Sequence, residues 1–416
     1  MRSRVKYHFL RLLLSAIFIG LLSAGMIWLL KNGTEQVEHL LMPVARNNVW
    51  VSVLFPITGL SIIYILRIYL FKKRENKGIK EVVDVLKTRN PQLPVYKIPS
   101  HIINGFLTII FGGSTGIEVS SVVASAAIGS AVNNQGSILK KYRSELICAG
   151  VAAAITALFN SPLAGIFFAY EVMYKKLTRS FVFLTSLATI VVYAFNFFLH
   201  EKPLFEVTVN TWHTYAIPYF ILLGIIAGFN SVYLTKMVIF LKKRFARFPQ
   251  KYTGVWVGAL TIGLIIYFFP ELYGEGYHAM GHMLETANEM DFTMTILWSL
   301  VPVLLLKPII TSLTLASGGD GGVFAPSLFI GAFLGLVMAL ILNNFFHAGV
   351  IPMNFMIVGM ASVLCSSIHA PLTAIFLVCG ITGNYVLLIP LAIGCAISRI
   401  TAQLTYPYTV YSYRPK

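Results

Sequence analysis

A glycine-rich segment that occurs twice is the feature that most constrains the fold of this chain. Residues 113 to 129 (GSTGIEVSSVVASAAIG) return in altered form as residues 319 to 335 (GDGGVFAPSLFIGAFLG). A second pair keeps nearly the same spacing, because residues 150 to 173 match residues 359 to 382 around a shared Pro-Leu. Two motifs repeated at one spacing indicate an internal duplication, with one glycine-interrupted helix start in each half.

The composition assigns the chain to a membrane. Of its 416 residues, 57% are hydrophobic and only 12% are charged, unlike a soluble domain of this length. Apolar stretches from residues 8 to 30 through 385 to 404 give about ten or more spans at roughly 20 residues per crossing. We expect one all-α, multi-pass transmembrane domain over residues 1–416. It would consist of two inverted-topology repeats, the first at about 48–200 and the second at about 213–405. A C-terminal cytoplasmic segment would follow at 406–416.

The charge distribution predicts the orientation. Lys and Arg number 32 against 16 Asp and Glu. They crowd five segments, namely residues 2–11, 72–97, 140–143, 175–179 and 236–251, whereas residues 271–291 contain none. The positive-inside rule then places both termini in the cytoplasm and the acidic loop outside. The basic clusters fit contact with anionic lipid, at about 1 kcal/mol per residue, and we expect no nucleic-acid partner.

Three acids stand out because they lie inside apolar stretches: Glu118, Glu171 and Asp320. A carboxylate at the bilayer centre costs about 2.5 to 3.5 kcal/mol, which favours a buried partner or an aqueous pathway. Glu118 follows the glycine-rich run and begins a helix of small residues. It either caps that helix or belongs to a site that the unpaired amides and positive dipole end create. The similar helix start at residues 321–326 favours the site, since inverted repeats aim both ends at one point near the midplane.

Other polar residues carry weaker signals. The four cysteines and nine histidines show no metal-ligand spacing, so we expect no cofactor, metal site or disulfide. His369 is expected to pack or to cap a helix. Tyr411 closes the last apolar segment within PYTVYS, from where its side chain can reach back toward the core.

The chain resembles the CLC family of chloride channels and proton/chloride antiporters in several motifs. The resemblance extends from about residue 75 to the C-terminus. GIEVS at residues 116–120 looks like the GxEGP segment, and GVFAP at 322–326 is similar to GxFxP. Further similar segments are FNSPLAG at 159–165, YGEGY at 273–277 and APLT at 370–373. The resemblance implies a homodimer in the inner membrane, without a C-terminal regulatory domain. Each subunit would contain about 18 tilted and re-entrant helices around its own pore.

The resemblance also implies roles for individual residues. Glu118 would be the gate that occupies or vacates the anion site. The anion would be bound by the Tyr411 hydroxyl and by the backbone N–H groups of Ile117, Glu118, Val323 and Phe324.

Three positions depart from the family pattern. Lys77, in NKGIK at residues 76–80, stands where the anion-coordinating serine is expected, and Ser120 replaces a proline. Val172 stands where many antiporters of the family have a proton-relaying glutamate. A valine at this position resembles the channels of the family. Glu171 matches a second family glutamate and is expected to be structural.

The sequence therefore predicts chloride-selective transport gated by Glu118, channel-like or weakly proton-coupled. The alternative is a proton/chloride antiporter that uses a water pathway, and fluoride or nitrate remains open as the anion. The alternative from a different class of function is an intramembrane enzyme that uses Glu118 as a general base. The sequence shows no nucleophile, metal-ligand set or second acid near Glu118 to support it.

Overall fold

The computed structural model describes residues 2–133, 139–290 and 293–413. Within these ranges the chain is helical, and its only β-type pairing is an isolated bridge. The first half contains α1 (Arg2–Asn47), α2 (Val49–Tyr69), α3 (Ile79–Leu86), α4 (Lys97–Ile110), α5 (Glu118–Asn133), α6 (Arg143–Phe159), α7 (Pro162–Phe168) and α8 (Arg179–Phe198). The second half contains α9 (Ile217–Phe245), α10 (Lys251–Phe268), α11 (Tyr277–Thr286), α12 (Met294–Ala316), α13 (Phe324–Phe346), α14 (Pro352–Ile368), α15 (Pro371–Thr382) and α16 (Leu388–Thr405).

The apolar stretches produce fewer full spans than their length suggests. In the described ranges, nine helices are long and apolar enough to cross a membrane, and three shorter apolar helices accompany them. Turns divide three of the stretches, because Gly112, Asn160 and His369 adopt positive φ angles. A proline then opens the next helix at α7 and α15, where its missing N–H is not needed. These divisions give sixteen α-helices in the described ranges, close to the expected 18 or so.

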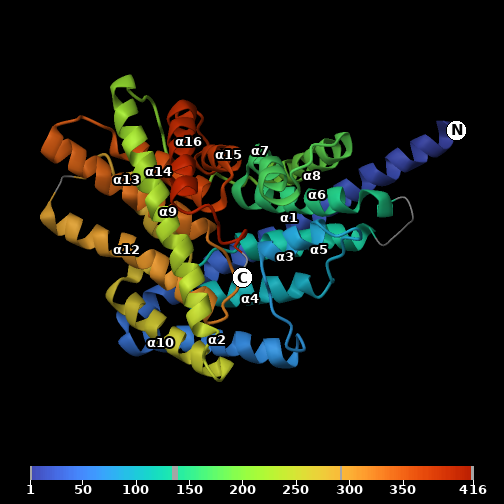
Figure 1. Cartoon of the computed structure of the whole chain (residues 1–416), viewed down its shortest axis with the longest axis horizontal. Coiled ribbons are helices and arrows are strands. Elements are labelled where there is room, and N and C mark those ends of the chain that lie inside the picture. The colour runs from blue at the N-terminus through green and yellow to red at the C-terminus, as the bar shows by residue number, and fades with distance from the viewer. Residues whose placement is uncertain (1, 134–138, 291–292, 414–416) are drawn as a thin grey trace.

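The two halves repeat the same packing. Helix α1 packs against α6 and α8 as α9 packs against α14 and α16, and α5 packs against α6 as α13 packs against α14. Figure 1 shows these groups on opposite sides of the molecule. The matching pairs favour a first repeat that includes α1 and so begins well before residue 48.

Small residues allow the paired helices to approach closely. A Cβ atom on Gly150 of α6 would overlap the carbonyl of Ser125 in α5. At the matching place in the second half, a Cβ atom on Gly359 of α14 would overlap the carbonyl of Gly331 in α13. Such contacts stabilise helix pairs in lipid, where no hydrophobic force drives them together. The duplicated small residues are therefore mainly packing residues.

Candidate anion site between the repeats

The two glycine-rich segments meet at the isolated bridge. The amide of Gly116 donates to the carbonyl of Gly322 at 3.4 Å, and the amide of Gly322 donates to the carbonyl of Gly116 at 3.2 Å. Helix α5 begins two residues after the first glycine, and α13 two residues after the second. The first amides of a helix have no partner within that helix and carry its positive end. Both positive ends therefore lie on either side of one bridge, as the duplication predicted.

Equivalent contacts from α4 and α12 hold the two segments. The amide of Ser114 donates to Oγ1 of Thr314 at 3.2 Å, and the amide of Asp320 donates to Oγ1 of Thr108 at 2.9 Å. Each threonine thus stabilises the segment that belongs to the other half of the chain. The backbone around the two helix starts is consequently fixed by both repeats together.

Glu118 lies at the start of α5 and is only 1% exposed. Its carboxyl group folds back over Gly116, where a Cβ atom would overlap Oε2. Oε1 accepts a hydrogen bond from the hydroxyl of Tyr277 at 2.6 Å, whereas Oε2 has no hydrogen-bond partner among the described residues. An acid in this position can block the space before the helix starts, and it can leave by rotation of its side chain.

A second acid lies beside Glu118, which the sequence analysis did not expect. The amide of Ile117 donates to Oε1 of Glu275 at 2.8 Å, so the amide proposed from the family resemblance is occupied here. Glu275 belongs to the YGEGY segment, in which Gly274 and Gly276 both have positive φ angles. Two such glycines make a tight turn that aims the acid between them, and this was the signal available in the sequence.

A fully buried lysine was also missed. Lys307 lies within α12 at 0% exposure, and its Nζ donates to the carbonyls of Gly274 and Glu275, both at 3.3 Å. The ammonium group also lies 4.5 Å from the ring centroid of Phe329, within the range of a cation–π interaction. A basic residue inside an apolar stretch is as informative as an acid. The position of Lys307 inside the apolar stretch at residues 295 to 317 was the signal available in the sequence.

Glu118 and Glu275 both line a cavity of about 400 Å³, which we call the acidic cavity. Its wall also includes Ile117, Phe159 and Tyr277. Three further glutamates and one lysine of the wall are Glu35, Glu38, Glu285 and Lys31. Because α1 and α11 supply most of these charges, the acidic cavity lies on the side of the acidic segment 271–290. This cavity gives solvent a route to the start of α5.

Tyr411 reaches the same bridge from the C-terminal segment. Its hydroxyl is buried, has no hydrogen-bond partner in the described part of the chain, and lies 3.7 Å from where a Cβ atom on Gly322 would be. A turn between Thr409 and Ser412 positions the residue, since the amide of each donates to the side-chain oxygen of the other. A free hydroxyl beside the start of α13, where Val323 and Phe324 lie, can donate to an anion.

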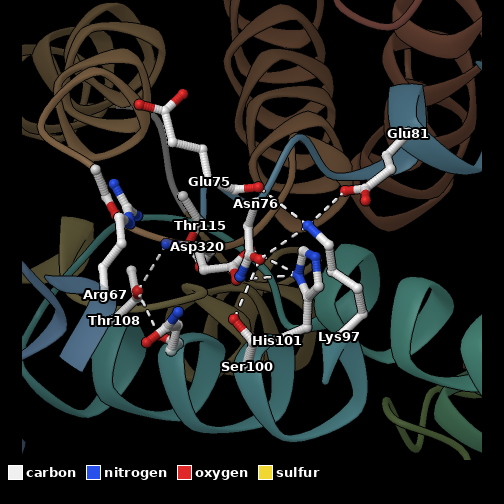
Figure 2. Close-up of polar contacts among 12 residues, drawn as sticks. Arg67, Glu75, Asn76, Glu81, Lys97, Ser100, His101, Thr108, Thr115 and Asp320 are labelled. Carbon is white, nitrogen blue, oxygen red and sulfur yellow. Dashed lines mark hydrogen bonds and ion pairs between the residues drawn. The ribbon is translucent and has the colours of Figure 1, made fainter. Parts of the chain in front are cut away.

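Segment 76–80 does not present Lys77 to the bridge. The Lys77 side chain is exposed, whereas Asn76 joins a buried polar cluster (Figure 2). Nδ2 of Asn76 donates to Oδ2 of Asp320 at 2.5 Å, and Nδ1 of His101 lies 3.0 Å from Oδ1 of Asp320. Lys97 pairs with Glu81 at 2.8 Å on the other side of Asn76. Asp320 is therefore a structural link between the halves, and Lys77, named above as a candidate anion ligand, lies outside this cluster.

The residues proposed around the proton relay occupy a π-helical turn at Ala169–Tyr174. Val172 is half-buried there and packs against the apolar core. Glu171 caps α15, because its carboxylate accepts from the amides of Leu372 at 3.2 Å and Thr373 at 2.9 Å. Glu171 is thus structural, as expected. His369 ends α14 in the left-handed conformation, which agrees with the expected capping role.

Comparisons with known proteins identify the family of this chain. The family model described as voltage gated chloride channel matches residues 58–403. The H(+)/Cl(-) exchange transporter ClcA of Salmonella paratyphi B is 30% identical over 355 residues, which cover 80% of this chain and 72% of that protein. A ClcB-like protein of Ralstonia nicotianae is 27% identical over 380 residues, covering 87% and 85%.

Solved structures share the fold. A CLC-type fluoride/proton antiporter superposes with a TM-score of 0.79 at 24% identity, covering 96% of each chain. A slow cyanobacterial Cl-/H+ antiporter gives 0.78 at 22% identity, covering 97% of this chain and 96% of that one. The family match over most of the sequence, together with a relative at 30% identity, shows that this chain belongs to the CLC family of voltage gated chloride channels and transporters, and so to the ion transport proteins rather than the enzymes.

Proposed function

We propose that the protein transports chloride across the membrane through a site between the starts of α5 and α13, gated by Glu118. The observation that carries the proposal is the buried carboxylate of Glu118 folded over Gly116 at the bridge to Gly322. Amides at the two helix starts and the Tyr411 hydroxyl supply donors without any cationic side chain. An anion and the Glu118 carboxylate compete for this space. Two negative charges within a few ångströms of each other repel strongly when they are shielded from water.

The direct test is anion flux through the purified protein in liposomes. We expect the protein to release trapped chloride, and the same assay with nitrate and fluoride ranks the three anions. The ranking matters because a fluoride/proton antiporter is among the structures that share this fold, and because Lys77 replaces the expected serine. Liposomes that retain all three anions would reject the proposal.

Replacing Tyr411 by Phe tests the hydroxyl donor. A neutral hydrogen bond nets about 0.5 to 1.5 kcal/mol, so we expect the Kd for chloride to rise roughly two- to tenfold. Isothermal titration calorimetry measures this directly. Tyr408→Phe is the matched control, since Tyr408 lies in the same segment but is 48% exposed. An unchanged Kd in Tyr411→Phe would remove this residue from the site.

Proton coupling is expected to be weak or absent. An aliphatic side chain cannot carry a proton, and Val172 stands at the relay position with Glu171 committed to capping α15. A chloride gradient across liposomes should therefore drive little or no uphill proton movement, as measured with a pH electrode. Stoichiometric proton pumping by the wild-type protein would contradict this expectation.

Proton/chloride exchange is the second candidate, and the buried polar face of α4 favours it. This face carries Lys97, His101, Asn104 and Thr108, all at most 2% exposed. Nε2 of His101 and Oδ1 of Asn104 have no partner among the described residues, and buried water characteristically bonds such atoms. Water along α4 would replace the relay glutamate. In that case Asn104→Leu should reduce proton movement in the same assay while chloride flux continues.

We also propose an inner-membrane homodimer with cytoplasmic termini and the acidic cavity facing outward. Cysteines introduced at Glu75 and Phe245 should react only from the cytoplasmic side, and a cysteine at Glu285 only from outside. The background is low because the four native cysteines are buried. Impermeant maleimide labelling of oriented vesicles reads out the side. Labelling of position 285 from the cytoplasm would reverse the orientation.

A further inference from the structure

We propose that Glu275 is a second carboxylate gate, which occupies the amide of Ile117 until an anion displaces it. The inference rests on the proposed function, since it concerns the path of the transported anion. It assigns the loop before α11, supplied by the second half of the chain, a role at the helix start of the first half.

The contact has the geometry of an anion on a helix start. Oε1 of Glu275 lies 2.8 Å from the amide nitrogen of Ile117, which is where a bound anion would sit. Ile117, Glu118 and Glu275 all line the acidic cavity. An anion that enters this cavity and binds the amide of Ile117 therefore has to displace Glu275 from it.

An independent observation points to a ligand at the same place. Oε2 of Glu118 is buried in the cavity wall and has no hydrogen-bond partner in the described ranges. Such an atom is costly to leave unpaired, so a proton, a water molecule or a rearranged side chain is needed there. Two carboxylates thus face one helix start, and an anion has to displace both.

A purely structural cap looks different in this protein. Glu171 uses both oxygens to cap α15, with the amides of Leu372 and Thr373 and the Thr373 hydroxyl as donors. Glu275 receives a single hydrogen bond from the amide of Ile117 across the described chain. A carboxylate held by one hydrogen bond on a cavity wall is more easily displaced than one held by three.

The surrounding loop lets the side chain move while its backbone stays fixed. Lys307 binds the carbonyls of Gly274 and Glu275, both at 3.3 Å, and Gly276 continues the turn at φ +89. The charge of Lys307 thus anchors the loop. Release of the Ile117 amide then requires only a rotamer change of Glu275, a motion of the nanosecond class or slower.

The test compares chloride binding and flux in Glu275→Gln and Glu275→Ala with the wild-type protein. The Gln variant keeps an oxygen of the same size but removes the charge, so it folds under the same constraints. We expect the Kd for chloride to fall about tenfold or more, because a competing charge a few ångströms away is removed. Flux at low chloride should rise accordingly. Glu285→Gln is the matched control, since Glu285 lines the same cavity but is exposed.

The outcomes separate the inference from the proposed function. Unchanged or weaker chloride binding in both Glu275 variants would overturn the second gate and leave Glu275 a cap, even when Glu118→Gln still changes flux. If the Ala variant fails to fold, the Gln variant decides alone. A wild-type protein that carries no anion would instead defeat the proposed function itself. The second gate also requires that Glu275→Gln tightens binding further in a Glu118→Gln background.

Discussion

Replacing Glu118 by Gln is expected to remove most of the pH dependence of chloride flux. The amide still accepts the hydrogen bond from Tyr277, but it has neither a charge that competes with chloride nor a site that takes up a proton. In the wild-type protein, protonation at low pH should neutralise the gate and raise flux. The variant should therefore carry chloride at alkaline pH at a rate close to the acid rate of the wild-type protein. At alkaline pH the flux of the variant should exceed that of the wild-type protein about tenfold or more. A tenfold change corresponds to only about 1.4 kcal/mol of free energy.

Chloride efflux from liposomes at a series of pH values measures this effect. Glu35→Gln is a suitable control, because Glu35 lines the acidic cavity but is exposed. The control should keep the wild-type pH profile. This result would show that the loss of one negative charge from the cavity wall does not by itself change the pH dependence of flux. A Glu118→Gln protein with wild-type flux and a wild-type profile would rule out gating by this residue.

Gly116→Ala should displace the gate without removing its charge. The added Cβ atom would overlap Oε2 of Glu118, so the carboxylate has to leave its place and lose the hydrogen bond from Tyr277. Hydrogen bonds to charged groups contribute about 1.5 to 3 kcal/mol. We therefore expect flux at alkaline pH to rise by about tenfold or more. Because Gly116 does not adopt a positive φ angle, alanine fits the backbone there.

The control for this substitution is Gly25→Ala in α1, where an added Cβ atom meets nothing within 4 Å. A double variant gives a sharper test. In a Glu118→Ala background no carboxyl group remains to be displaced, so Gly116→Ala should add nothing to the flux. Coupled residues show such non-additivity, whereas independent sites add. Additive effects would mean that Gly116→Ala acts through the bridge to Gly322 rather than through Glu118.

The prediction from sequence was most successful where local structure depends on short segments. The helix starts at Glu118 and Phe324 follow from glycine runs before small-residue helices, and the Tyr411 hydroxyl followed from a segment beside the last helix. It was less successful for the number of membrane-spanning helices, since Asn160 and His369 interrupt stretches of uniform hydropathy. A hydropathy window averages over a single left-handed residue and so misses the turn.

The buried polar cluster around Asn76 and Asp320 shows a second limit of prediction from sequence. The sequence pointed to Lys77, whereas the structure places Asn76 against Asp320 and leaves Lys77 exposed. Neighbouring loop residues point in different directions, and motif alignment does not determine which side chain turns inward. Only the packing of α4 against both halves decides that Asn76, His101 and Asp320 meet.

The sequence alone determined the membrane class, the duplication and the buried acid at the start of α5, because each is recorded in composition or in short segments. The tertiary structure decided that Glu275 binds the amide of Ile117 and that Lys307 anchors the loop of Glu275. These residues lie far apart in the chain, and their meeting depends on how the two repeats assemble around the Gly116 to Gly322 bridge. Hydrophobic pattern specifies which helices form, but the contacts between charges arise only when both halves fold together.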